Sequence, residues 1–302
     1  MASLDYQIEN YMPAEALDAL IATARREDLG PEGVDVTCQA TIPPRSGGDA
    51  TMSPRLAGVL AGGALLPRIA EAYDPRISVE VLVRDGATIT RHEAVARFDG
   101  PLDSILTMER VALNFVTHLS GIATLTARYV AQTVGTRARI YDTRKTVPGL
   151  RGLAKYAVTC GGGHAHRMGL YDAMLVKDNH LAGVSLEALP RVLDQAIRRA
   201  RADNPGIKFV EVEVDSLEQL ERVFEVQGVE VVLLDNMGAE QLHKAVARRD
   251  MQRPGMALEA SGGVDLETVK AIAEAGVDRI AVGALTHSAP ALDLGLDIAE
   301  RR

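Results

Sequence analysis

Short apolar runs alternate with amphipathic stretches in the second half of the chain. After residue 135, six aliphatic or β-branched runs have the pattern of strands: ARIYD, DAMLVKD, KFVEVEV, VEVVLLDN, MALEAS and DRIAVG. Between the later runs, residues 186–202, 216–227, 239–249 and 265–276 have the apolar spacing of helices. This alternation predicts parallel strands joined by helical crossovers. A full eight-stranded barrel takes ~250 residues, so the shorter length favours an incomplete α/β barrel or a doubly wound sheet.

The first part of the chain has a different pattern, which suggests a second domain. A helical opening, AEALDALIATARRED, precedes LAGVLAGGALLPRIAEAY, which predicts a strand, a turn and a helix. The run ISVEVLVRDG then predicts a strand. Ser104 is a candidate N-cap for a long helix that runs to about Val134, because apolar residues from Ile105 onward recur with a period near 3.6.

Composition and charge narrow the classes of function. The 302 residues are 47% hydrophobic and 25% charged, as in an ordinary soluble globular protein. The net charge of −8 and the scarcity of aromatic residues disfavour nucleic-acid binding. Cys38 and Cys160 match no metal-ligand spacing. No signal peptide is evident and no apolar run reaches the roughly 18 residues of a membrane span. We therefore expect a cytoplasmic protein with neither nucleic-acid nor membrane partners.

Each predicted strand of the second half stays apolar until its carboxyl end, where polar or small residues follow. The residues at these ends are Thr143, Arg144 and Lys145, then Lys177, Glu213, Asp235, Ser261 and Gly283. In parallel α/β folds, the groups that carry out chemistry gather at this edge of the sheet. A single buried carboxylate is explained by a structural ion pair, but six strands that end in this way favour a site.

A cluster of cations indicates what the site binds. Its members are Arg144, Lys145, Arg151, His166, Arg167 and Lys177, in a chain that is acidic overall. They flank apolar strands and the glycine run Gly161–Gly163 instead of occupying a polar helix face. The cluster predicts a basic pocket for a small polyanion. The glycine run does not have the spacing of a dinucleotide-binding loop.

Two glycine-containing loops form a candidate phosphate site. Ser261, Gly262 and Gly263 follow a strand and precede a helix expected over Asp265–Gly276, and Gly283 with ALTHSAP repeats the arrangement. Backbone N–H groups near a helix N-terminus bind anions, and the final loops of α/β barrels often bind phosphate. Glu213 and Asp235 could hold ribose hydroxyls and support positive charge at C1. These residues favour transfer of a phosphorylated sugar.

At these residues the chain resembles the quinolinate phosphoribosyltransferase family. The matching stretches follow the family's order over most of the chain: REDLG with DVT (26–37), ERVALNFVTHLSGIATLT (109–126), DTRKTVPGLR (142–151), KYAVTCGGG (155–163), HRMGLYDAMLVKDNH (166–180), EVEV (211–214), LLDNM (233–237), EASGG (259–263) and VGALTHSAPALD (282–293). The resemblance implies phosphoribosyl transfer from phosphoribosyl pyrophosphate (PRPP) to quinolinate with decarboxylation. The products would be nicotinate mononucleotide, pyrophosphate and CO2, a step of NAD biosynthesis.

The resemblance also implies an architecture and partners. An N-terminal α/β sandwich domain would cover residues 1–117, joined by a C-terminal helix at about 289–302. An open parallel α/β barrel with fewer than eight strands would cover 118–288 and carry the active site. Magnesium would arrive with PRPP and not in a protein cage of its own. The enzyme would be a homodimer, or a hexamer built from dimers, with active sites shared between subunits.

The family's site residues carry over by position. Lys145, Glu213 and Asp235 would be catalytic, with Lys145 between the acceptor and PRPP and both carboxylates facing the ribose. The substrate-binding residues would be Arg110 from the neighbouring subunit, Arg144, Thr146, His166, Arg167 and Lys177. The 5′-phosphate would be held by Ser261, Gly262, Gly263, Gly283, Ala284 and Leu285.

The departures from the family are small, and three alternatives remain. Ala165 stands where the family usually has Asn, Cys38 replaces a common Thr, and Gln227-Gly228 adds one residue. One alternative is the related pyrophosphorylase-like protein of molybdenum-transport operons. The others are a Schiff-base aldolase that uses Lys177 and a non-enzymatic regulator that binds a phosphometabolite.

Overall fold

The computed structural model describes residues 7–301, which form two compact units. The first unit contains the chain up to Ala127, Pro148–Gly162 and the chain from Ser288, and the second contains Arg128–Val147 and Gly163–His287. The predicted domain boundary at residues 117 and 118 lies inside one continuous helix, α4 (Leu102–Gln132), and its position stays a prediction. Among residues 7–301, no helix combines the length and the apolar character that crossing a bilayer would require.

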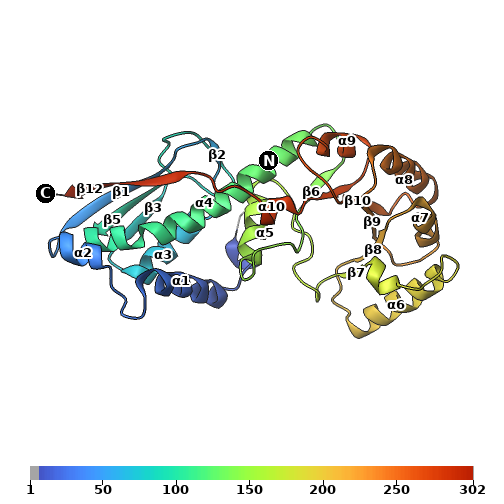
Figure 1. The fold of residues 1–302 in the computed structure, drawn as a ribbon, viewed down its shortest axis with the longest axis horizontal. Helices are drawn as coiled ribbons and strands as arrows, with labels where there is room; N and C mark the ends of the chain where they lie inside the picture. The colour runs from blue at the N-terminus through green and yellow to red at the C-terminus, as the bar shows by residue number, and fades with distance from the viewer. Residues whose placement is uncertain (1–6, 302) are drawn as a thin grey trace. The chain divides into compact units, whose positions relative to one another are not determined.

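The first unit is built on a four-stranded antiparallel sheet in the order β12-β1-β5-β3 (Figure 1). Its strands are β1 (Gly47–Pro54), β3 (Ser78–Val81), β5 (Ala96–Pro101) and β12 (Leu294–Arg301), and β2 (Gly58–Val59) pairs separately with β4 (Thr88–Ile89). Its helices are α1 (Ala14–Leu29), α2 (Val36–Thr41), α3 (Leu66–Tyr73), most of α4 and α5 (Arg151–Cys160), with 3-10 turns at Ile8–Asn10 and Gly63–Leu65. Buried and half-buried residues alternate along β1, because one face of the sheet packs on the core.

Two local predictions for this unit are wrong. The chain end expected to be helical is strand β12, which pairs with β1 over its whole length. The apolar residues of LGLDIAER recur every second position, which is the period of a strand and not of a helix. Ser104 is also not an N-cap, because α4 begins at Leu102 directly after β5. The Ser104 hydroxyl instead donates a hydrogen bond to Asp74 Oδ2 at 2.7 Å.

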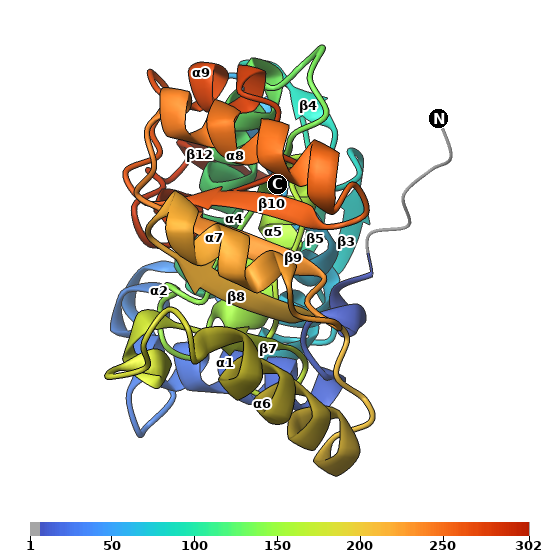
Figure 2. The ribbon, with the colours of Figure 1, turned by 90° about the vertical axis from the view of Figure 1, so that its right-hand side faces the viewer.

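The second unit is a six-stranded parallel sheet, which confirms the predicted α/β class and the strand number below eight. The strand order is β6-β11-β10-β9-β8-β7, so the sheet is open between its edge strands β6 and β7. The strands are β6 (Arg139–Tyr141), β7 (Met174–Val176), β8 (Val210–Val214), β9 (Val231–Asp235), β10 (Ala257–Ser261) and β11 (Arg279–Ala281). Helices α6 (Leu189–Asp203), α7 (Leu217–Phe224) and α8 (Ala239–Gln252) cover one face of the sheet (Figure 2). The unit also holds α9 (Val269–Glu274), α10 (Ala284–His287) and a 3-10 turn, Asp178–Leu181.

The central strands β8 and β9 of this sheet are largely buried. In β9 the four residues before Asp235 are buried, and in β8 Val210, Val212 and Val214 are buried. Burial on both sides of a parallel sheet explains these aliphatic runs. The helix expected from Asp265 begins only at Val269. The Asp265 carboxylate instead accepts hydrogen bonds from the N–H groups of Glu267 and Thr268 and holds a turn.

Candidate active site

The carboxyl ends of the parallel strands surround a cavity of about 620 Å³. Ten of the residues that the sequence predicts for the site line it: Arg144, Lys145, His166, Arg167, Lys177, Glu213, Asp235, Ser261, Gly262 and Gly263. Glu213, Asp235 and Ser261 lie at or near the ends of β8, β9 and β10. The other seven lie in the segments after β6, before and after β7, and after β10, and β11 contributes Ala281 to the lining. The parallel topology brings them together because all strand ends of one direction meet at one edge.

The other predicted residues lie elsewhere in the described chain. Arg110 is exposed on α4, in the unit that does not contain the cavity. Gly283 adjoins the site, because a Cβ atom there would lie 3.2 Å from Lys145 Cδ. Leu285 is fully buried, so its side chain faces the core. The roles of Arg110 and Leu285, like those of Thr146 and Ala284, stay predictions.

Two arginines define the cationic side of the cavity. Arg167 is only 7% exposed, and its Nη1 donates to the carbonyl of Ala173 at 3.4 Å. Burial and the neighbouring charge of Arg144 lower the pKa of Arg167 from its usual value. The two guanidinium groups repel each other in a poorly solvated place, and a ligand with negative charge would relieve that repulsion.

Lys177 and Glu213 form an ion pair at the carboxyl ends of strands β7 and β8. The Lys177 ammonium lies 2.6 Å from Glu213 Oε2, and the Glu213 side chain is only 11% exposed. A cation and a carboxylate are therefore fixed next to each other on the cavity wall. The backbone of Lys145 is fixed by a hydrogen bond, which the Thr286 hydroxyl donates to the Lys145 carbonyl at 2.7 Å.

Asn236 links the glycine loop to Asp235. Its Nδ2 donates to Asp235 Oδ2 at 2.7 Å, and its backbone N–H donates to the Ser261 carbonyl at 2.9 Å. Gly262 has φ of +91°, and a Cβ atom there would lie 2.1 Å from Asn236 Oδ1. The loop therefore needs glycine at this position for both its backbone angle and its close approach to Asn236. The candidate phosphate loop also stands apart from a helix N-terminus, since α9 begins only at Val269.

This contact gives a testable pair of variants. Gly262→Ala should displace Asn236 from Asp235, lower the thermal stability and raise the KM for the phosphorylated substrate. Gly263 is the matched control, because its φ of +61° is also positive and disfavours alanine, but no atom lies within 4 Å of the added Cβ. Both variants should lose roughly 1–2 kcal/mol through the backbone angle, and only Gly262→Ala should lose more. Thermal unfolding and steady-state kinetics on both proteins measure this, and equal effects would contradict the proposed link.

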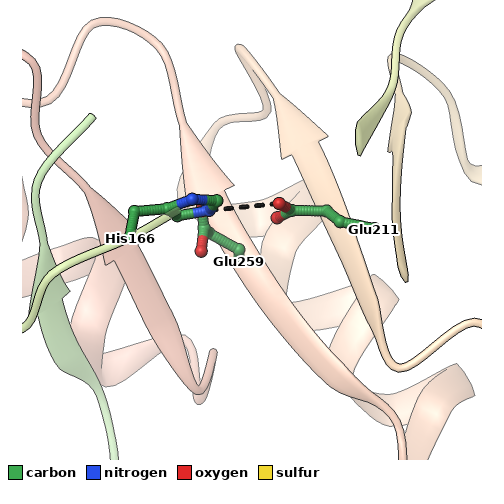
Figure 3. Close-up of side chains that lie close together, drawn as sticks. All are labelled: His166, Glu211 and Glu259. Carbon is green, nitrogen blue, oxygen red and sulfur yellow. Dashed lines mark ion pairs between the residues drawn. The ribbon is translucent and has the colours of Figure 1, made fainter. Parts of the chain in front are cut away.

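His166, Glu211 and Glu259 form a buried cluster (Figure 3), and His166 and Glu259 belong to the lining of the cavity. His166 Nε2 lies 3.1 Å from Glu211 Oε2 and 3.3 Å from Glu259 Oε1. Both carboxylates are fully buried, and the His166 side chain is 7% exposed. The backbone N–H of His166 donates to Asp142 Oδ1 at 2.8 Å, and the N–H of Arg167 donates to His166 Nδ1 at 2.8 Å. The imidazole is therefore engaged at both nitrogens within the protein, and its predicted direct contact with substrate stays a prediction.

Sequence reasoning missed three residues of this region: Glu259, Asn236 and Asp142. Each stands in or directly after a strand, and a charged or amide residue inside an apolar run was the available signal. Glu211 lies in the matching stretch EVEV, but it was not among the predicted site residues either. Its place against His166 depends on the register of β8 and β10, which lie on either side of β9, and the sequence pattern does not specify that register.

Comparison with known proteins gives one consistent answer. The models of the quinolinate phosphoribosyl transferase family match residues 35–120 with the N-terminal domain and 122–297 with the C-terminal domain. Nicotinate-nucleotide pyrophosphorylase (carboxylating) of Mycobacterium leprae is 45% identical over 286 residues, which cover 93% of this chain and 98% of that protein. The probable enzyme of that name from Bacillus subtilis is 35% identical, with 90% of each chain covered. The crystal structure of NadC from Streptococcus pyogenes superposes with a TM-score of 0.85 at 36% identity, covering 95% of this chain and 97% of that chain. The chain therefore belongs to the quinolinate phosphoribosyltransferase family.

Proposed function

We propose that this protein transfers the phosphoribosyl group of PRPP to quinolinate and decarboxylates the product to nicotinate mononucleotide, for NAD biosynthesis. Membership of the family and the names of its relatives support this reaction. The observation that carries the proposal is the meeting of Arg144, Lys145, Arg167 and Lys177 with Glu213 and Asp235 on one cavity. A dianionic acceptor and a phosphorylated ribose together need such a combination of charges.

The proposed arrangement assigns each side of the cavity to one substrate. Arg144, Arg167 and Lys177 hold the two carboxylates of quinolinate. Ser261, Gly262 and Gly263 offer backbone N–H groups to the 5′-phosphate of PRPP, with Gly283, Ala284 and Leu285 beside them. Glu213 and Asp235 face the ribose, where carboxylates bind hydroxyls and offset positive charge that develops at C1.

The chemistry follows from these positions. The quinolinate nitrogen bonds to C1 of the ribose as the bond from C1 to pyrophosphate breaks, and Lys145 offsets the charge of the departing pyrophosphate. The ring nitrogen then carries a positive charge. The bond between C2 and its carboxylate breaks, CO2 leaves, and the electron pair stays on C2 next to the charged nitrogen. A proton adds to C2 and completes nicotinate mononucleotide.

Magnesium fits the donor set of this cavity as a companion of PRPP. Glu213 and Asp235 provide oxygen donors of the kind that this cation prefers, and both line the cavity. Lys177 already engages one oxygen of Glu213, so the two carboxylates alone are an incomplete ligand set. Magnesium bound mainly by PRPP oxygens would neutralise charge on the pyrophosphate that leaves.

Two further proposals concern the setting of the enzyme. We propose a homodimer, or a hexamer of dimers, that completes each site with Arg110 from a neighbouring subunit, and a cytoplasmic location. The ion pair of Lys177 with Glu213 supports an anion-binding lysine over the Schiff-base alternative. Turnover would separate the enzyme from a regulator that only binds a phosphometabolite.

A direct assay tests the reaction. Purified protein with magnesium, PRPP and quinolinate labelled in the C2 carboxylate should release labelled CO2 and form nicotinate mononucleotide in equal amounts. Omission of PRPP should abolish CO2 release, because decarboxylation needs the ribosylated nitrogen. Lack of turnover by a folded protein would contradict the proposal.

A further inference from the structure

Two buried carboxylates, Glu211 beneath the cavity and Glu259 in its lining, lie close to a single imidazole. Glu211 and Glu259 are fully buried, and no carboxylate oxygen of either has an aligned hydrogen-bond partner among residues 7–301. His166 Nε2 is the polar atom that lies close to both, at 3.1 and 3.3 Å. Figure 3 shows the imidazole edge directed between the two carboxyl groups. Two buried carboxylates that share one imidazole are costly, so this placement calls for a function.

The hydrogen bond on the other side of the ring fixes its tautomer. The Arg167 N–H donates to His166 Nδ1, so this nitrogen carries a lone pair and the ring proton sits on Nε2. Two charged carboxylates would raise the pKa of the imidazole to about 10 against the opposing effect of burial, but a second ring proton has no place at Nδ1. Burial and the charge of Glu211 also raise the pKa of Glu259. A proton on Glu259 would relieve the repulsion between the two buried carboxylates.

The same tautomer argues against a metal ion. The ligand atoms of His166, Glu211 and Glu259 lie within 4.8 Å of one another, as they do in metal sites. A histidine that binds a metal through Nε2 must present a lone pair there and usually donates from Nδ1. In this cluster Nδ1 accepts a hydrogen bond, so Nε2 is a donor.

Arg167 connects the cluster to the cationic side of the cavity. The Asp142 carboxylate holds the N–H of His166, the His166 ring holds the N–H of Arg167, and the ring itself is held by the glutamates. The buried Arg167 guanidinium then lines the cavity beside Arg144. Two arginines that repel each other keep one geometry only if their backbone is fixed.

We propose that Glu211 and Glu259 are positioning residues for the acceptor: they hold the His166 ring in its Nε2–H tautomer and thereby fix the Arg167 backbone and guanidinium. The pair acts through His166 and touches no substrate itself. The link to quinolinate rests on the proposed function, whereas the tautomer and its dependence on the pair do not.

Two arginines near the cluster offset the negative charge of the glutamates. Arg279 lies over the rings of Tyr141 and Phe209, at 4.9 and 5.4 Å from their centroids, and its charge acts on Glu259. The charge of Glu211 in turn acts on Arg167. Removal of the whole pair therefore takes a negative charge away from between two arginines, while replacement of one carboxyl by an amide does not.

The double variant Glu211→Met with Glu259→Met separates positioning from simple stability. Apolar replacement of buried charged groups is often neutral or stabilising, so a purely structural role predicts equal or higher stability with unchanged kinetics. Positioning predicts a KM for quinolinate that rises about 10- to 100-fold, with the KM for PRPP within a factor of about three of wild type. Glu259→Gln, which keeps an acceptor and a donor, should rescue the KM for quinolinate. Glu230→Gln is the matched control, because Glu230 is a carboxylate at the opposite end of the same sheet, bound to the Val210 N–H.

NMR of protein with ¹⁵N-labelled histidine gives a readout that needs no activity. A His166→Asn variant assigns the ring signals, which distinguish the Nε2–H from the Nδ1–H tautomer. We expect the Nε2–H form in the wild type and in Glu259→Gln, and its loss or exchange in the double Met variant. An Nδ1–H ring in the wild type, or a wild-type KM for quinolinate in a folded double variant, would overturn the proposal. If the double variant does not fold, the tautomer of the wild-type ring decides alone, because the single amide variants are expected to keep it. Absence of any turnover with quinolinate in the wild type would refute the proposed function while leaving the tautomer result to judge the cluster.

Discussion

Nicotinate in place of quinolinate should lower kcat/KM by a factor of about 30 to 5,000. Nicotinate lacks the C2 carboxylate, so part of the cation cluster would stay buried without its partner. Loss of such a contact costs on the order of 2–5 kcal/mol, and the factor follows from that energy. Arg167 should contribute most, because burial and Arg144 already disfavour its charge in the empty cavity.

Steady-state kinetics with each acid at saturating PRPP measure this selectivity. Nicotinate should also be tested as a competitive inhibitor, which separates weak binding from slow chemistry. A kcat/KM for nicotinate within a few-fold of that for quinolinate would contradict the assignment of the cation cluster to the second carboxylate.

Arg110→Ala and Lys145→Ala should each be nearly inactive alone and should restore about a quarter of wild-type activity when mixed. Lys145 lines the cavity, whereas Arg110 is exposed on α4 in the other unit. If Arg110 serves a neighbouring subunit, a mixed dimer has one site with both substitutions and one intact site. Random assortment of equal amounts makes about half of the dimers mixed, and each has half of its sites intact.

Co-refolding of the two variants, followed by assay and by mass analysis of the assembled dimers, tests this expectation. Refolding each variant with itself is the control and should restore nothing. If mixed dimers form and no activity returns, Arg110 acts within its own chain, and the shared-site proposal is wrong.

The lining of the cavity is largely predictable from the sequence, and the cluster beneath it is not. Residues such as Lys177, Glu213 and Asp235 end apolar runs, and parallel topology places all such ends at one edge. Glu211 and Glu259 lie within β8 and β10, so their contact with His166 depends on the register of two strands that do not pair directly. Gly262 stands out in the sequence, but the reason that only glycine fits there is its contact with Asn236. That contact joins the loops after two different strands.

Helix predictions failed where strand pairing or a side-chain hydrogen bond to the backbone outweighed the local sequence pattern. The chain end LGLDIAER contains good helix formers, yet its alternating apolar residues match the long strand β1, and the pairing decides its form. The four residues before α9 were expected to be helical, but the Asp265 carboxylate binds nearby N–H groups and holds a turn.

The pairing of β1 with β12 has a consequence for the order of folding during synthesis. β1 lies between β5 and β12, and its partners in β12 lie 240 to 254 positions later in the sequence, from the pairing of Pro54 with Leu294 to that of Gly47 with Arg301. The ribosome releases β12 after every other described strand, so until then one side of β1 presents unpaired backbone groups. An exposed strand edge of this kind is where nascent chains associate wrongly. Early chaperone contact and slow, late completion of the first sheet should therefore accompany biosynthesis, while neighbouring strands β7 to β11 can pair in the order in which they emerge.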